Sequence, residues 1–380
     1  MFDRSKFLDI EPYGTSQEAE AACSRVRQHP EFVFALATAL FPGADEASYA
    51  QRKWFTGAVL SRLEEVHCYD DFQKKITCDV FLDNVILKYT VGDFSYNGQE
   101  KLDPKQSYLF VSNHRDIVLD CALLDLALFR SGVPICEMAI GDNLLTNSFI
   151  EDIFKLNGAI IVKRDLPVRE KYLETVRLSE YFVEKIASGK SIWVAQKSGR
   201  SKDGLDVTHP SIIKMLHLAK KREGVSFADV IRSCRIVPVA VSYEYDPNDI
   251  SKAREEIMTM HDGDYSKGRY EDLFSMIRGL REYKGNVHIT FGDVLTGEWT
   301  SPDDVASEID RQIHAGYRLW PTNWFSYDYL NGNSSNSDKY GSLDTEAFLA
   351  RFAHLNDEVR SFILNSYANP VRSQLEALGR

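Results

Sequence analysis

The residues best suited to chemistry are Asn113, His114, Arg115 and Asp116, which stand between two apolar runs. A histidine between a strand and a helix can face a cleft, where its ring can take a proton from a reacting hydroxyl group. Such a base needs an acidic partner to orient the ring; Asp120 is the first candidate and Asp116 the alternative. The simpler interpretation is that Asn113 or Asp116 caps the helix and His114 is a loop residue.

Two later segments could bind an anion such as phosphate. In the first, residues 158–164 (GAIIVKR), a short apolar run ends in Lys163 and Arg164. α/β folds bind ligands at the carboxyl ends of their strands, and a guanidinium group pairs well with phosphate. The alternative is a buried strand that ends in a solvated basic pair.

The second of these segments is a glycine-containing loop, residues 195–204 (AQKSGRSKDG). Its backbone N–H groups and basic side chains could surround a phosphate. The candidate ligands are Gly199, Arg200, Ser201 and Lys202, with Lys197 nearby. An exposed basic loop without a ligand is the alternative.

These segments lie in an alternation of short apolar runs and amphipathic stretches. The apolar runs that predict strands are residues 108–112, 159–162, 191–195, 236–242 and 286–295. Strands separated by helices predict an α/β fold with a mixed, largely parallel sheet and helices packed on its faces. Residues 85–95 read as an additional β-like run.

Helical periodicity outside this alternation predicts three parts of the chain. They are an N-terminal helical cap (residues 1–80), the α/β core (residues 81–300) and a C-terminal helical extension (residues 301–380). An aromatic stretch at residues 317–330 is expected to pack in the interior, with a membrane-facing patch as the alternative.

The segments, in their order along the chain, resemble the motifs of the lysophospholipid and glycerol-3-phosphate acyltransferase superfamily, in particular the 1-acylglycerol-3-phosphate acyltransferases. SNHRDIVLD is similar to the first motif, an Asn-His pair followed by four residues and an aspartate. Residues 158–164 and the Arg200-Ser201 pair resemble the second and third motifs. IVPVAVS, with Pro238 at its centre, resembles the fourth. The resemblance extends over residues 94–295.

The sequence departs from the family at two points, which indicates a divergent member. Five residues rather than four separate His114 from Asp120, and one added residue rotates a helical side chain by about 100°. The third motif lacks its glutamate, and Lys197 and Ser198 stand near that position.

The resemblance implies a reaction and a set of site residues. His114 is expected to act as general base while a fatty acyl group moves from acyl-CoA or acyl-carrier-protein to a hydroxyl of a lysophospholipid or glycerol phosphate. No metal or organic cofactor is expected. The residues expected to hold the acceptor phosphate are Arg164 and Arg200, with Lys163, Gly199, Ser201 and Lys202. The residues expected to shape the acyl cleft are Gly158 and Pro238.

Three other functions are alternatives to phospholipid biosynthesis. A lyso-aminolipid such as a lyso-ornithine lipid could be the acceptor in the same reaction. A lipid-binding pseudoenzyme is favoured if Asp120 turns away from His114 and no other carboxylate replaces it. An α/β hydrolase fits poorly, because no GxSxG sequence occurs in the chain.

The composition indicates a globular protein without a large basic surface. A formal charge of −11 argues against a nucleic-acid partner, and six scattered cysteines suggest reduced thiols in the cytoplasm. The start of the chain does not resemble a secretory signal. The longest apolar run, residues 32–41, is short of the roughly 20 residues that a membrane-spanning helix needs. We therefore expect a cytoplasmic protein, in peripheral contact with the inner face of the cell membrane.

Overall fold

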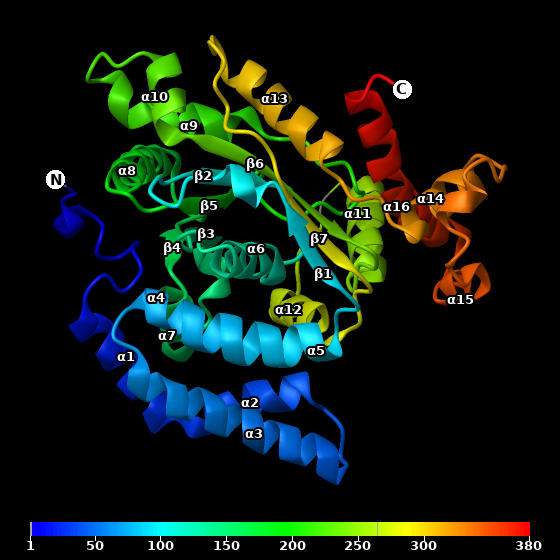
Figure 1. Cartoon of the computed structure of the whole chain (residues 1–380), viewed down its shortest axis with the longest axis horizontal. Helices are drawn as coiled ribbons and strands as arrows, with labels where there is room; N and C mark the ends of the chain where they lie inside the picture. Colours follow the sequence, from blue (N-terminus) through cyan, green and yellow to red (C-terminus); the bar gives the residue numbers. More distant parts are fainter. Residues whose placement is uncertain (1, 264) are drawn as a thin grey trace.

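The computed structural model describes residues 2–263 and 265–380, which contain a mixed seven-stranded sheet (Figure 1). The strands are β1 (Phe94–Asn97), β2 (Leu109–Ser112), β3 (Glu137–Gly141), β4 (Ala159–Val162), β5 (Ile192–Ala195), β6 (Ile236–Tyr243) and β7 (Val287–Phe291). Their order across the sheet is β1-β7-β6-β2-β5-β3-β4. Strands β2 to β6 run parallel, β7 is antiparallel to β6, and β1 is parallel to β7. The predicted mixed, largely parallel sheet is confirmed.

The parallel direction of β2, β4 and β5 brings the three chemistry-bearing segments to one edge of the sheet. His114 follows β2, Arg164 follows β4 and Arg200 follows β5. These strands are short and apolar because both faces of the sheet are covered, as is usual for parallel sheets. Ligand sites in such sheets lie beyond the carboxyl ends of the strands.

Helices cover both faces of the sheet (Figure 1). One face carries α6 (Leu119–Arg130) and α12 (Glu271–Arg281); the other carries α8 (Val168–Ala187), α9 (Pro210–Lys221), α10 (Phe227–Cys234) and α13 (Pro302–Ala315). Remaining short elements are α7 (Ser148–Leu156), η1 (Arg4–Lys6), η2 (Leu63–Glu65), η4 (Gln99–Lys101), η5 (Asp142–Leu144) and η6 (Ser337–Lys339).

The N-terminal part of the chain is helical as far as Tyr89. Its helices are α1 (Ser16–Gln28), α2 (Pro30–Leu40), α3 (Glu46–Arg62), α4 (Tyr69–Phe72), the π-helix η3 (Gln73–Ile86) and α5 (Leu87–Tyr89). The prediction of a β-like run at residues 85–95 is therefore wrong except at its end, where Phe94 and Ser95 begin β1. Val85 and Ile86 are buried in a helix that packs on α6, and a short apolar run suits such a helix as well as a strand.

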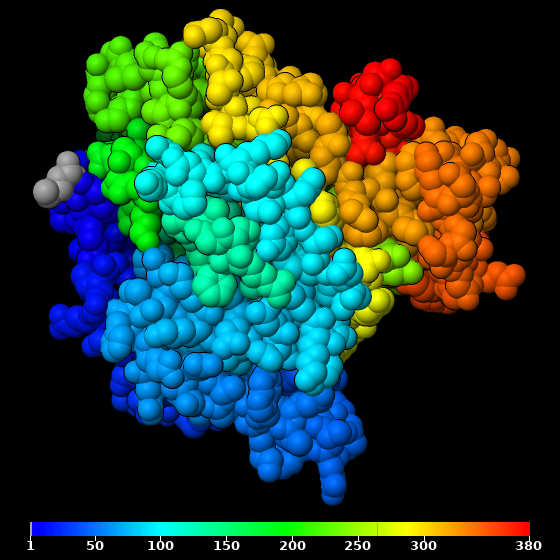
Figure 2. Space-filling model, in the orientation of Figure 1, coloured from blue at the N-terminus to red at the C-terminus, as the bar shows by residue number. Residues whose placement is uncertain are grey.

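The C-terminal helices pack in a second apolar cluster beside the sheet. α14 (Pro321–Leu330), α15 (Thr345–Ala350) and α16 (Asp357–Ala377) pack against α11 (Asp249–Asp262). Figure 2 shows these helices, in orange and red, on one side of the molecule. Much of the aromatic stretch at residues 317–330 is interior, since Tyr317, Trp320 and Phe325 are buried.

Candidate active site

His114 and Asp120 form a hydrogen-bonded pair at the carboxyl edge of the sheet. The Nδ1 atom of His114 lies 2.8 Å from Oδ2 of Asp120. The aspartate side chain is fully buried, whereas 14% of the histidine side chain is exposed. The other ring nitrogen, Nε2, makes no hydrogen bond to any residue that the structure describes. One ring nitrogen is thus held by a carboxylate, and the other is available to a substrate.

Three further donors fix the Asp120 carboxylate. The backbone N–H groups of Arg115 and Asp116 donate to Oδ2 at 2.6 and 2.9 Å, and the Tyr243 hydroxyl donates to Oδ1 at 2.9 Å. Burial, together with the nearby Asp120 charge, raises the pKa of Tyr243 well above its usual value, so the phenol stays protonated as a donor. Asp120 also lies in the first turn of α6, where the helix dipole favours a negative charge.

Asp116 has a structural role at the start of α6. Its Oδ1 accepts the backbone N–H groups of Val118 and Leu119, both at 2.9 Å, and so caps the start of α6. Burial, with a smaller contribution from the Asp120 charge, raises the pKa of the Asp116 carboxyl. Of the two acids proposed to orient His114, Asp120 contacts the ring. The added residue relative to the family motif does not turn Asp120 away, because α6 begins only at Leu119.

Asn113 ties this segment to the neighbouring strand. Its side chain exchanges hydrogen bonds with the backbone of Val241 in β6, at 2.7 and 3.0 Å. It also donates to the buried carboxylate of Asp206 at 3.1 Å. The Asp206 carboxylate also accepts hydrogen bonds from the Arg115 guanidinium at 2.7 Å and from the Tyr317 hydroxyl at 2.5 Å. Sequence reasoning missed Asp206, Tyr243 and Tyr317, because none of them stands in a recognisable motif.

The 195–204 loop contacts the backbone of His114. The N–H of Ser201 donates to the backbone carbonyl of His114 at 2.8 Å. Gly199 has φ of 79°, a conformation that glycine adopts readily, and an added Cβ there would meet no atom within 4 Å. Nη1 of Arg200 is buried without a hydrogen-bond partner among the described residues. Lys202, in contrast, pairs with Glu255 at 3.0 Å and Glu256 at 3.2 Å.

The segment at residues 158–164 likewise holds one paired and one unpaired basic side chain. Lys163 pairs with Asp9 at 2.6 Å, whereas the exposed Arg164 side chain makes no ion pair within the described parts of the chain. Arg164 stands on the rim of a groove of about 510 Å³. Apolar side chains from β3, β4, β5, α8 and α9 line this groove, together with Ile10. His114 is not among the lining residues, although β5, which contributes to the wall, pairs with β2.

The two residues predicted to shape the acyl cleft lie in or beside strands of the sheet. Gly158 directly precedes β4 and so lies at the amino ends of the parallel strands, opposite to the carboxyl ends that His114 follows. Its φ of 78° is a conformation that glycine adopts readily. Pro238 is in register with Val111 inside the sheet, just beyond the last pair of the β7 ladder. Its missing N–H therefore removes no ladder hydrogen bond. Neither residue lines the apolar groove, and their part in an acyl cleft stays a prediction.

No group of three or more His, Cys, Asp or Glu side chains suited to a metal ion is found within residues 2–263 and 265–380. The side chains that the sequence placed at this edge of the sheet are a histidine, its buried carboxylate partner and two arginines that form no ion pair with any described residue. Such a set can accept a proton and bind a phosphate.

Comparison with protein families agrees with the motifs. Residues 93–242 match the family model described as Acyltransferase. Among solved structures, the chain is similar to the 1-acyl-sn-glycerophosphate acyltransferase PlsC from Thermotoga maritima, with 13% identity and a TM-score of 0.36. That match covers 78% of this chain and 91% of the other. No curated protein matches the sequence. Residues 93–242 thus form an acyltransferase-family domain, which confirms the family that the motifs predicted.

Proposed function

We propose that the protein transfers a fatty acyl group from acyl-CoA or acyl-carrier-protein to a hydroxyl of a lysophospholipid or glycerol phosphate, as a step of phospholipid biosynthesis. The observation that carries the proposal is the His114–Asp120 pair, whose Nε2 makes no hydrogen bond to a described residue, at the same sheet edge as Arg164 and Arg200. The acyltransferase-family match supports the transfer of an acyl group but leaves donor and acceptor open.

In the proposed reaction His114 serves as general base. Nε2 takes the proton of the acceptor hydroxyl while that oxygen attacks the thioester carbonyl carbon. The tetrahedral intermediate collapses, the C–S bond breaks, and the proton on Nε2 passes to the leaving thiolate. Asp120 keeps the proton of the resting ring on Nδ1 and stabilises the imidazolium. General-base catalysis of this kind contributes roughly 10²–10⁴-fold in rate.

The two arginines would position the acceptor. Arg200 is adjacent to Ser201, whose N–H holds the His114 carbonyl, so a phosphate bound there would lie near the base. The unpartnered Nη1 of Arg200 supports this role, because a buried cationic donor without an acceptor is costly. Gly199 leaves the backbone of this loop open to a ligand. Arg164 would extend the same positive site towards the apolar groove.

The groove and its surroundings suit a lipid substrate. A cavity of about 510 Å³ with apolar walls can hold part of an acyl chain. Val168, at the start of α8, is 88% exposed, and Tyr172 and Leu173 on the same helix are also exposed. In the described parts of the chain no helix is apolar and long enough to cross a bilayer. We propose peripheral contact with the inner face of the cell membrane through such exposed apolar residues.

The test is to incubate the protein with a long-chain acyl-CoA and, separately, with lysophosphatidate or a lyso-ornithine lipid, and to detect the acylated product. We expect acylated lysophosphatidate from the parent protein and none from His114→Ala. Product from the lyso-ornithine lipid alone would replace the proposed acceptor. No His114-dependent product with either acceptor, and none with acyl-carrier-protein as donor, would favour the lipid-binding pseudoenzyme.

A further inference from the structure

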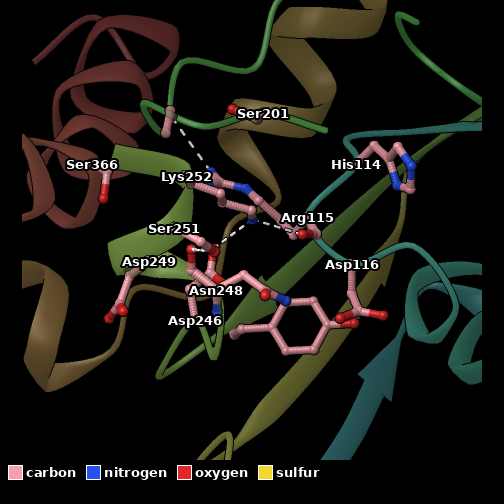
Figure 3. Close-up of polar contacts among 12 residues, drawn as sticks. His114, Arg115, Asp116, Ser201, Asp246, Asn248, Asp249, Ser251, Lys252 and Ser366 are labelled. Carbon is pink, nitrogen blue, oxygen red and sulfur yellow. Dashed lines mark hydrogen bonds and ion pairs between the residues drawn. The ribbon is translucent and has the colours of Figure 1, made fainter. Parts of the chain in front are cut away.

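A buried lysine from outside the family-matched segment reaches the histidine motif. Lys252 belongs to α11, beyond residue 242 where the family match ends, and its side chain is 3% exposed. Its Nζ donates to the backbone carbonyl of Arg115 at 2.7 Å and to Oδ2 of Asp246 at 2.5 Å. Figure 3 shows Lys252 and Asp246 gathered beside Arg115, next to the segment that carries His114.

The Arg115 carbonyl that Lys252 binds belongs to the same peptide group as the N–H of Asp116. That N–H donates to Oδ2 of Asp120 at 2.9 Å, and the same oxygen accepts the bond from Nδ1 of His114. The ammonium group is thus linked to the imidazole through one peptide group and one carboxylate. In a buried chain of hydrogen bonds each bond polarises the next, so a cation at one end strengthens donation at the other.

The surrounding contacts hold this peptide group in place. The Arg115 side chain is fixed by the buried Asp206, and the His114 carbonyl by the N–H of Ser201. Asp246 accepts the N–H of Asn248 at 2.7 Å, and its own N–H donates to the Tyr367 hydroxyl in α16. Burial opposes ionisation of Asp246, but the Lys252 ammonium outweighs it and holds the pKa of the carboxyl below its usual value. The Asp246 carboxyl is therefore ionised at neutral pH.

We infer that Lys252 is a positioning residue for the His114 base, acting through the Arg115–Asp116 peptide group and Asp120. The inference rests on the proposed function for its effect on turnover, but its effect on the ring of His114 does not. If the Lys252–Asp246 ion pair served only to pack the helices, Lys252 would not need its hydrogen bond to the Arg115 carbonyl. The segment after residue 242 would then contribute a positioning residue to the catalytic site.

The sign of the effect follows from the charges. Without the Lys252 cation, the Asp116 N–H donates less strongly, and the Asp246 carboxylate loses its ion-pair partner and keeps only the nearby Arg115 charge. Both changes stabilise the protonated imidazole, so the pKa of His114 rises in Lys252→Met. In Asp246→Asn the lysine charge is uncompensated instead, and the pKa of His114 falls. Lys252→Arg keeps the charge and should stay close to the parent.

The experiment is an NMR titration of the histidine ring signals in the parent, Lys252→Met, Lys252→Arg and Asp246→Asn, with the His114 signal assigned by its loss in His114→Ala. Lys101→Met is the matched control, since Lys101 forms a surface ion pair with Asp293. We expect a rise of about 0.5 pKa unit or more in Lys252→Met and a shift of opposite sign in Asp246→Asn. In assays, kcat should fall about tenfold in Lys252→Met while KM stays within about twofold.

An unchanged His114 titration in a folded Lys252→Met would overturn the inference. If that variant does not fold, the absence of a downward shift in Asp246→Asn has the same meaning. A shifted titration in a protein that shows no His114-dependent acyl transfer would reject the proposed function and leave the positioning role of Lys252 intact.

Discussion

The two arginines and the two lysines of the phosphate-binding segments differ in what surrounds them. Lys163 and Lys202 each pair with carboxylates, from Asp9 in one case and from Glu255 and Glu256 in the other. Arg164 and Arg200, one and two residues away, make no ion pair within the described residues. Cations that are close in sequence therefore divide into neutralised and available charges. Only the available ones should contribute much to binding an anionic substrate.

The largest effect on substrate binding is expected at Arg200. A hydrogen bond to a charged group is worth about 1.5–3 kcal/mol, so Arg200→Ala should raise KM for lysophosphatidate by roughly 10–150-fold. Arg200→Lys keeps the charge but loses the paired hydrogen-bond geometry of the guanidinium. Its KM should therefore lie between those of the parent and Arg200→Ala. The measurement is the initial rate of product formation against acceptor concentration. A KM within twofold of the parent value would remove Arg200 from the acceptor site.

Arg164 should show a smaller effect of the same kind. Its side chain is exposed, so solvent and salt weaken its attraction for a phosphate. We expect Arg164→Ala to raise KM by about three- to tenfold, and the difference from the parent to shrink as salt increases. A change in kcat alone, at unchanged KM, would contradict a role in binding.

The lysines should matter least. Lys163→Met and Lys202→Met each remove a cation that is already neutralised, so KM should change by less than about threefold. The reverse test is Glu255→Gln, which removes a carboxylate that neutralises Lys202. It should make the Lys202 charge more available and lower KM slightly. An effect of Lys202→Met as large as that of Arg200→Ala would break the distinction between the two classes of cation.

The sequence predicted the architecture well where hydrophobic pattern and strand order agree. The runs at residues 108–112, 159–162 and 191–195 form adjacent or nearby parallel strands, and this alone brings His114, Arg164 and Arg200 to one edge. The pattern failed for β3, whose sequence EMAIG carries only a weak apolar signal. The pattern also failed at Val85 and Ile86, because a buried helix and a buried strand favour the same apolar residues.

The site was predictable in its residue types but not in its partners. The choice between Asp116 and Asp120 depends on where α6 begins, and helix starts cannot be located to one residue from the sequence. Likewise, Asp9 and Glu255 lie far along the chain from the lysines that they neutralise. Lys252 and Asp206 reach the motif only through tertiary packing, so no local signal marks them.

The measurement that tests the account most directly compares the two acids of the first motif. Asp120→Asn should lower kcat for acyl transfer by roughly 10²–10⁴-fold, because the amide cannot stabilise the imidazolium of His114. Asp116→Asn should keep kcat within about threefold of the parent, since asparagine caps a helix as well as aspartate does. Full activity in a folded Asp120→Asn, or an equal loss in both variants, would contradict the assignment of His114 and Asp120 as the catalytic pair.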